Sequence, residues 1–231
     1  LTFFKASKIV VTSEQTKNLI AKKYQKKTSV KLAIAQSNEV VSSQHSVMRE
    51  AISDNLVKLL FIGRFEYWKG VQICIKSLVD LKYNYSEMNV RLTLIGEGVY
   101  KKELQTLAKV LGVDSMIDWH SWMEQSKLAE FYSSHDVFLF PSLHDSGGMV
   151  VLEALAASMP VICLNLGGPA TIITESSGVV IDSNLSEEKI CQKIALEIFI
   201  ITRAENYLRY CENARKRAQE FTWEKLVVEL L

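Results

Sequence analysis

The chain has 231 residues, 48% of them hydrophobic, and its 27 basic and 26 acidic residues leave a formal net charge of +1. This length and composition predict a globular protein with a substantial core, organised as one domain or slightly more. The near-neutral balance offers no electrostatic basis for binding nucleic acid or an anionic membrane surface, so any bound anion must be held by local groups.

Short β-branched or apolar runs recur along the chain and predict strands. They cover residues 8–12, 30–34, 57–62, 90–95, 116–120, 136–140, 160–164 and 178–181. Stretches with helical spacing lie between most of them, for example residues 101–111 and 127–134. Because strand and helix alternate and several strands are apolar on both faces, the sequence predicts an α/β fold, a doubly wound parallel sheet covered by helices on both sides.

Two changes of pattern divide the chain. Residues 35–53 are polar and rich in serine, and we place a domain boundary there. From Ser186, a predicted helix cap, the pattern becomes helical, with helices over residues 187–201 and 203–220 and a third from Trp223. The predicted units are therefore residues 1–53, a ligand-binding domain over residues 54–222, and the start of a final helix over residues 223–231.

The loop after the third strand is the first candidate binding element, because ligands of open parallel sheets bind at the carboxyl ends of the strands. Its sequence is G-R-F-E-Y-W-K-G, from Gly63 to Gly70, so Arg64 and Lys69 stand between two glycines. Glycine allows close approach of the backbone to a ligand, and an arginine with a lysine suits a diphosphate. The alternative is a solvated loop with ordinary surface charges.

Residues 141–156 form the second candidate element, a loop that leads into an apolar helix. Gly147 and Gly148 at the helix entrance expose N–H groups at the positive end of the helix dipole, where anions bind. Glu153 lies among apolar residues, where a carboxylate is costly unless it is solvated or bonded to donors. A pair of ligand hydroxyls would supply such donors; the alternative is that Glu153 marks the solvent-facing side of the helix.

Weaker signals follow two other strands. The run N-L-G-G-P, with Pro169 at the first turn, predicts another glycine-lined helix entrance. The run Gly96-Glu97-Gly98 resembles the start of a dinucleotide fingerprint, but no third glycine follows at the required spacing, which disfavours NAD. No pair of carboxylates has the D-x-D spacing of metal-held diphosphates, so we expect neither a metal nor another cofactor.

Taken together, these motifs resemble the carboxyl-terminal domain of the family-four (group 1) retaining glycosyltransferases, which have the GT-B architecture. They are G-R-F-x-x-x-K-G, the following G-x-G, P-S-L-H-D-S-G-G-M-V-V-L-E-A-L-A-A-S-M-P-V-I-C and N-L-G-G-P, in order between about Leu56 and Trp223. The resemblance implies a Rossmann-like donor-binding half of an enzyme that transfers a hexosyl or other glycosyl group from a UDP- or GDP-sugar, with retention, in polysaccharide biosynthesis.

The resemblance also implies roles for individual residues. The family's E-x7-E motif falls on Asp145 and Glu153; Glu153 would bind the donor ribose, and Asp145, one methylene shorter than glutamate, would contact the donor sugar. Arg64 and Lys69 would clamp the diphosphate, and the base would lie near residues 120–123. The implied catalytic residues are Arg64, Lys69 and Asp145, and the other substrate-binding residues are Gly63, Gly96, Gly147, Gly148, Met149, Val150 and Glu153.

The resemblance implies a partner as well. Residues 1–53 resemble the end of an amino-terminal domain plus the interdomain linker, and residues 223–231 resemble the helix that crosses back to that domain. We therefore expect a piece of a longer enzyme that binds its donor but does not transfer sugar alone. Two alternatives remain open: a GT-B nucleotide-sugar epimerase, and a non-catalytic nucleotide-sugar-binding module, which the aspartate at position 145 favours.

Cysteine usage and hydropathy indicate the compartment. The four cysteines, scattered without a C-x-x-C pair or metal-ligand spacing, predict reduced thiols; they are Cys74, Cys163, Cys191 and Cys211. The longest strongly apolar stretches are too short to span a bilayer, and no signal peptide opens the chain. We expect a cytoplasmic protein, with peripheral attachment to the inner face of the membrane only through the absent amino-terminal half.

Overall fold

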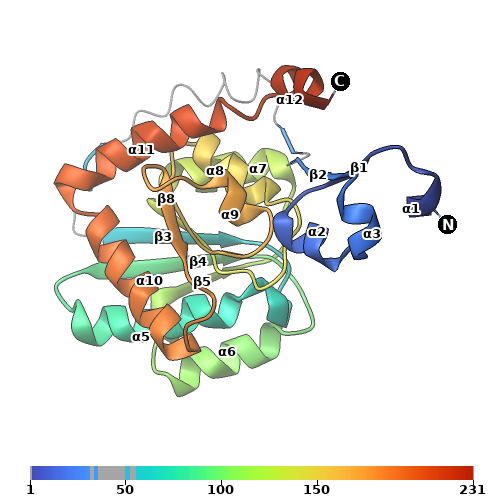
Figure 1. Ribbon diagram of the computed structural model, residues 1–231. Coiled ribbons are helices and arrows are strands. Elements are labelled where there is room, and N and C mark those ends of the chain that lie inside the picture. Colours follow the sequence, from blue (N-terminus) through green and yellow to red (C-terminus); the bar gives the residue numbers. More distant parts are fainter. Residues whose placement is uncertain (1, 32–33, 36–49, 53–55, 231) are drawn as a thin grey trace.

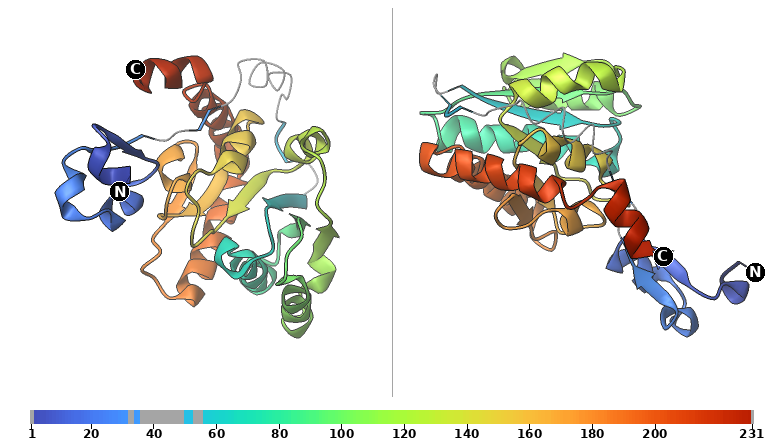
Figure 2. Two further views of the ribbon diagram at one scale, coloured as in Figure 1. Left: turned by 90° about the vertical axis from the view of Figure 1, so that its right-hand side faces the viewer. Right: turned by 90° about the horizontal axis from the view of Figure 1, so that it is seen from above.

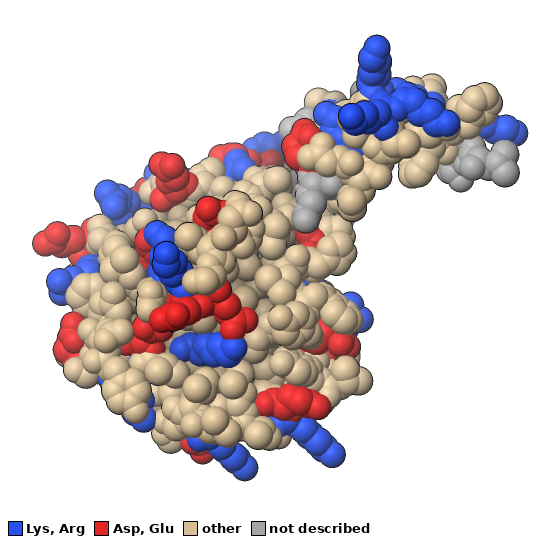
Figure 3. Space-filling model, turned by 60° about the horizontal axis from the view of Figure 1, so that its bottom comes forward, with Lys and Arg blue, Asp and Glu red and all other residues tan. Residues whose placement is uncertain are grey.

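The computed structural model describes residues 2–31, 34–35, 50–52 and 56–230, which form a small amino-terminal unit and a larger body (Figure 1). The small unit projects from the body in the views of Figure 2. Lys and Arg side chains gather on this projection in Figure 3. Its elements are α1 (Thr2–Lys5), β1 (Ile9–Val11), α2 (Glu14–Leu19), α3 (Lys22–Gln25) and β2 (Thr28–Val30).

The strand expected over residues 30–34 is wrong in position, because β2 runs from Thr28 to Val30. The parallel ladder with β1 aligns Ile9 with Thr28 and Val11 with Val30, so the short β1 fixes where β2 can pair. Thr28 also donates its hydroxyl to the Tyr24 carbonyl, which ties the start of β2 to α3. Most of the serine-rich segment proposed as a domain boundary, residues 36–49 and 53, lies outside the described residues.

The body is built on a six-stranded parallel sheet with the order β5-β4-β3-β6-β7-β8. This order confirms the predicted doubly wound sheet. Each strand ends at the predicted residue and begins within one residue of the predicted start. The strands are β3 (Leu56–Ile62), β4 (Asn89–Ile95), β5 (Ile117–His120), β6 (Val137–Phe140), β7 (Val161–Leu164) and β8 (Gly178–Ile181).

Helices cover both faces of the sheet. On one face lie α5 (Val71–Asn84), α6 (Lys101–Val110) and α10 (Glu187–Ile201), with α10 packed against α5. On the other face lie α7 (Gln125–Ser134), α8 (Met149–Ala156) and α11 (Ala204–Ala218), with α11 packed against α8. The remaining elements are α9 (Pro169–Ile172), α12 (Trp223–Leu230) and the 3-10 turns η2 (Tyr67–Lys69) and η3 (Asp114–Met116).

The predicted helical tail is confirmed, since α10 has the predicted bounds and α11 falls within the predicted range. Ser186 caps α10 as expected, because its side-chain oxygen accepts a hydrogen bond from the Lys189 N–H. A search of the described residues finds no helix with the length and hydropathy that crossing a membrane requires.

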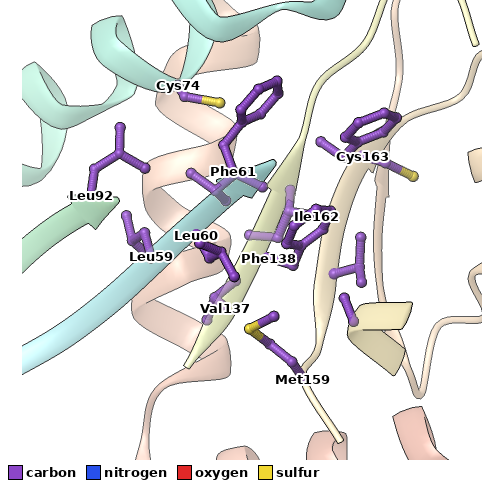
Figure 4. Close-up of a cluster of buried hydrophobic side chains, with 14 of the residues drawn as sticks. Leu59, Leu60, Phe61, Cys74, Leu92, Val137, Phe138, Met159, Ile162 and Cys163 are labelled. Carbon is purple, nitrogen blue, oxygen red and sulfur yellow. The ribbon is translucent and has the colours of Figure 1, made fainter. Parts of the chain in front are cut away.

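The core lies between the sheet and its two helical layers (Figure 4). Leu59, Leu60 and Phe61 of β3 are fully buried, so consecutive side chains are covered on both faces of this strand. Phe138 lies within 6.0 Å of Phe140, ring centroid to centroid. The four cysteines are buried and free, as predicted, and burial raises the pKa of Cys163 to about 12.

Candidate functional site

The candidate site lies at the carboxyl edge of the sheet, where β3 and β6 run side by side. β3 pairs with β4 on one side and with β6 on the other, so the chain leaves these two strands in opposite directions. This divergence creates the crevice in which doubly wound sheets bind ligands. A cavity of about 700 Å³, here called the main cavity, occupies it. Its lining includes Gly63, Arg64, Glu66, Gly96, Glu97, Gly98, Trp122, Met123, Gln125, Leu128, Met149, Val150 and Glu153.

The loop after β3 places Arg64 in this lining. Phe65 is fully buried, its ring meets the Trp119 ring edge-on at 5.8 Å between centroids, and its N–H donates to the Glu97 carbonyl. The anchored Phe65 leaves Arg64 exposed. Within the described ranges, no side chain or carbonyl forms an ion pair or hydrogen bond with the Arg64 guanidinium. This cation is therefore available to an anionic ligand.

Close backbone contacts lock the loops of the site together. The Leu143 N–H and the Ser142 hydroxyl both donate to the Trp68 carbonyl, at 2.8 Å and 3.1 Å. Gly70 has φ of 74°, and a Cβ there would lie 2.0 Å from the Pro141 carbonyl oxygen. At Gly96 a Cβ would lie 1.9 Å from the Gly63 carbonyl oxygen. Gly96 therefore has a packing role in addition to its place in the cavity lining.

Lys69 and Asp145 form a network beside the main cavity. The Lys69 ammonium lies 2.5 Å from Asp145 Oδ2, and the two side chains are 15% and 16% exposed. Asp145 Oδ1 accepts the N–H groups of Gly147 at 3.1 Å and Gly148 at 2.9 Å. The Lys69 ammonium also lies 5.5 Å from the centroid of the Phe140 ring. Both carboxylate oxygens of Asp145 are thus engaged. The N–H groups of Gly147 and Gly148, which were predicted to bind an anionic ligand, bind the Asp145 carboxylate instead.

Glu153 reaches the main cavity from α8 and is held by two donors from α7. Gln125 Nε2 donates to Glu153 Oε1 at 2.9 Å, and the Tyr132 hydroxyl donates to Oε2 at 2.7 Å. Burial raises the pKa of the Glu153 carboxyl, and these two hydrogen bonds oppose the rise. Glu153 is thus half-buried and has two hydrogen-bond donors. It is a partly buried, oriented acceptor in the wall of a cavity.

The structure divides the residues predicted for the site into two groups. Six line the main cavity, namely Gly63, Arg64, Gly96, Met149, Val150 and Glu153. Lys69, Asp145, Gly147 and Gly148 instead form the adjacent network. Met149 and Val150 begin α8, so their N–H groups have no acceptor within the helix.

Sequence reasoning missed Gln125 and Tyr132. They lie seven positions apart on α7, which places them on the same side of that helix two turns apart. That spacing was the available signal in the sequence. Only the packing of α7 beside α8 shows that both side chains reach Glu153. The nucleotide base was predicted to lie near residues 120–123. Trp122 and Met123 of this segment line the cavity, whereas the His120 ring contacts the Phe131 ring at 5.1 Å between centroids.

The carboxylates of the main cavity do not form a metal centre. Glu97 pairs with Lys101 at 3.2 Å, and a hydrogen bond with Ser121 followed by Lys101 lowers its pKa. Glu153 is bonded to Gln125 and Tyr132. In the part of the chain that the structure describes, no three His, Cys, Asp or Glu residues are grouped so that they could hold a metal ion. Arg64 is the one Lys or Arg side chain of the described lining, and the lining also includes Met149 and Val150 at the start of α8.

Comparisons with known proteins agree on one family. A family model described as glycosyl transferases group 1 matches residues 42–217. A D-inositol 3-phosphate glycosyltransferase of Arthrobacter sp. (strain FB24) is 30% identical over 129 residues, which are 54% of this chain and 31% of that protein. The chain thus spans about a third of this curated relative.

Solved structures show the same fold. A glycosyltransferase from Rickettsia africae superposes with a TM-score of 0.76 at 19% identity, over 97% of this chain and 62% of that one. The pneumococcal O-GlcNAc transferase in complex with UDP and GlcNAc superposes with a TM-score of 0.74 at 16% identity, over 99% of this chain and 45% of that one.

Proposed function

We propose, from the premise that this chain belongs to the glycosyl transferases group 1, that its main cavity binds a nucleoside diphosphate sugar as the donor of a retaining glycosyl transfer. One observation carries the proposal: the cavity brings together the unpaired Arg64, the first turn of α8 and the oriented carboxylate of Glu153. These are a cation, backbone donors and a hydroxyl acceptor, the groups that a ribonucleoside diphosphate needs. The UDP in the pneumococcal neighbour supports this ligand class.

In the proposed complex, the diphosphate lies between Arg64 and the N–H groups of Met149 and Val150, and the ribose lies against Glu153. The base extends toward Trp122. Lys69 adds its charge from beside the cavity. Negative charge grows on the diphosphate as its bond to the anomeric carbon breaks, and fixed cations and helix N–H groups stabilise that charge. Front-face attack by the acceptor, with retention, is part of this proposal.

Asp145 has a second part in the proposed mechanism. The family resemblance assigns it to the donor sugar, and its ion pair with Lys69 lets it also hold that ammonium in place. Asp145→Asn keeps the shape of the side chain but removes the charge proposed to face the donor sugar. It should therefore spare nucleotide binding and alter turnover of the sugar donor, which separate titration and turnover measurements would show.

The acceptor side is proposed to come from protein outside these 231 residues. The chain accounts for 62% of the Rickettsia structure and 31% of the Arthrobacter protein, which supports a partner domain in the complete enzyme. Positioning an acceptor against a donor can lower a barrier by about 7–11 kcal/mol. We therefore expect this chain to bind the donor and to transfer no sugar at a useful rate.

The experiment measures binding of UDP, GDP and their sugars by this chain, with transfer assayed beside the complete enzyme. Binding by the chain and transfer only by the complete enzyme is the expected result, with a dissociation constant in the micromolar to millimolar range, about 4–8 kcal/mol. Release of a free sugar isomer without acceptor would indicate an epimerase, and binding without turnover by the complete protein a non-catalytic module. Well-folded chain that binds no nucleotide would refute the donor site.

A further inference from the structure

The α7 side of the main cavity holds the Glu153 carboxylate in a fixed arrangement. α7 lies beside α8 (Figure 1), and Tyr132 and Gln125 donate to different oxygens of this carboxylate, at 2.7 Å and 2.9 Å. Glu153 is half-buried and lines the cavity, so a ligand there can still reach it. An ionised carboxylate has about four lone-pair positions on its two oxygens. α7 therefore occupies one position on each oxygen and leaves the others for a ligand.

The core fixes the position of Tyr132. This residue is 2% exposed, and its ring lies 6.0 Å from the Phe138 ring of β6, centroid to centroid. Phe138 is itself fully buried, so the phenol ring has no space to move away from Glu153. Burial first, and then the negative charge of Glu153, raise the pKa of the Tyr132 hydroxyl well above its ordinary range. The hydroxyl therefore remains a hydrogen-bond donor near neutral pH.

The same hydrogen bonds favour the ionised form of Glu153. Burial raises the pKa of its carboxyl, and the hydrogen bond from Tyr132, followed by that from Gln125, lowers it. Protonation would turn one carboxylate oxygen into a hydroxyl donor and so remove acceptor positions. Tyr132 thus affects both where Glu153 lies and how many hydroxyls it can accept.

We propose that Tyr132 is a positioning residue that makes Glu153 a receptor for two neighbouring hydroxyls, so that the main cavity selects ribonucleotides over 2′-deoxynucleotides. The inference rests on the proposed donor site and deepens it. The 2′- and 3′-hydroxyls of ribose lie on one side of the sugar ring, where each can donate to one Glu153 oxygen. A 2′-deoxynucleotide leaves one of these positions without a donor, which lowers affinity. Tyr132 lies outside the cavity lining and acts through Glu153.

The test measures binding of UDP and GDP, with their 2′-deoxy and 2′,3′-dideoxy counterparts, by calorimetric titration. Tyr132→Phe keeps the ring and removes the hydroxyl. It should weaken ribonucleotide binding roughly fivefold, weaken 2′-deoxynucleotide binding less and leave dideoxynucleotide binding unchanged, because the dideoxy sugar has no hydroxyl to donate. Gln125→Ala removes the other donor at an exposed position and should give the same order of effects.

Two further measurements separate positioning from a general loss of structure. Tyr132→Phe should weaken ribonucleotide binding no further when combined with Glu153→Ala, because it then has no carboxylate to act on. In Tyr132→Phe alone, the lost hydrogen bond should raise the pKa of Glu153, so ribonucleotide affinity should fall at a higher pH on acidification than in the wild type. The other charged side chains of the cavity lining, Arg64, Glu66 and Glu97, are the same in both proteins.

Tyr207 provides a matched control. It is 1% exposed and its hydroxyl donates to Asp136 Oδ1 at 3.1 Å, so Tyr207→Phe also removes a buried tyrosine–carboxylate hydrogen bond, but outside the cavity lining. It should leave nucleotide discrimination and its pH dependence unchanged.

Three results would overturn the inference while the donor site stands. They are equal binding of ribonucleotide and dideoxynucleotide by the wild type, an equal effect or no effect on both ligands in Tyr132→Phe and Gln125→Ala, and the same pattern in Tyr207→Phe. A wild-type chain that binds neither UDP nor GDP would instead refute the donor site itself, and this inference with it.

Discussion

The surroundings of Arg64 and of Lys69 differ more than their shared loop and shared charge would lead one to expect. Arg64 is exposed, lines the main cavity and has no partner among the described residues, whereas Lys69 is largely buried in an ion pair with Asp145. Asp145 in turn holds the N–H groups of Gly147 and Gly148. Partner geometry, rather than residue type, thus separates a cation that is free to bind from one that also holds two loops together.

The largest expected effect is on stability, at Asp145. Asp145→Ala leaves a mostly buried ammonium and two N–H groups without their acceptor, so we expect the free energy of unfolding to fall by about 3 kcal/mol. Arg64→Ala removes an exposed, unpaired side chain and should change it by no more than about 0.5 kcal/mol. Urea unfolding of both variants measures the difference. Similar small losses for both would remove the distinction between the two environments.

The next effect is on nucleotide binding, at Arg64. Arg64→Ala should weaken UDP or GDP binding by about 1.5–3 kcal/mol, because a charge-assisted hydrogen bond to phosphate is lost, and should spare the bare nucleosides. Lys69→Ala should weaken binding of the diphosphate in the same way, but it should also lower the free energy of unfolding. Calorimetric titration checks both variants, with Arg209→Ala on α11 as a control. An equal loss for nucleoside and diphosphate would exclude the phosphate clamp.

The ribose contact should give a smaller effect. Glu153→Gln keeps the shape of the side chain but removes the charged acceptor, so UDP should bind about 1–2 kcal/mol more weakly. The 2′-deoxy nucleotide should lose less, because one hydroxyl partner is already absent. Titration of both nucleotides into wild type and variant gives the comparison. If Glu153→Gln binds both with wild-type affinity, Glu153 does not contact the ribose.

The smallest expected effect is on the pH dependence of stability, through the Glu153 carboxyl. Burial raises the pKa of Glu153 in the folded state, so the ionised form disfavours folding above that pKa. The penalty disappears as the pH falls below the ordinary glutamate value of 4.5, where both states are protonated. The wild type should therefore gain stability on acidification relative to Glu153→Gln, whose side chain does not ionise. Unfolding of both proteins from pH 4 to 8 measures this difference, and a difference that stays constant with pH would mean that the pKa of Glu153 is not raised.

The strand ends illustrate what the sequence was able to predict. The predicted strand ends in the body agree with the structure because those strands are apolar runs closed by glycine, proline or polar residues, a local signal. The fold and the candidates Gly63, Arg64 and Glu153 follow from such signals combined with the rule for ligand position in doubly wound sheets. The family resemblance implied the other three cavity residues, Gly96, Met149 and Val150.

The partners of the site residues were beyond that reasoning. Lys69 meets Asp145 across 76 positions of sequence, because β3 and β6 are neighbours in the sheet. Tyr132 and Gln125 meet Glu153 because α7 packs near α8, which no pattern within α7 reveals. The predicted position of β2 was wrong for a similar reason, because pairing with β1 rather than local propensity sets that position.

The most direct test is an NMR titration of the isotopically labelled chain with UDP and GDP, followed at individual backbone N–H groups. We expect the largest shifts at Arg64, Met149 and Val150, smaller shifts at Gly147 and Gly148, whose N–H groups stay bonded to Asp145, and none at Thr106 on α6. Shifts that centre on α6 or on the amino-terminal unit, with the start of α8 unchanged, would contradict the assignment of the main cavity as the donor site.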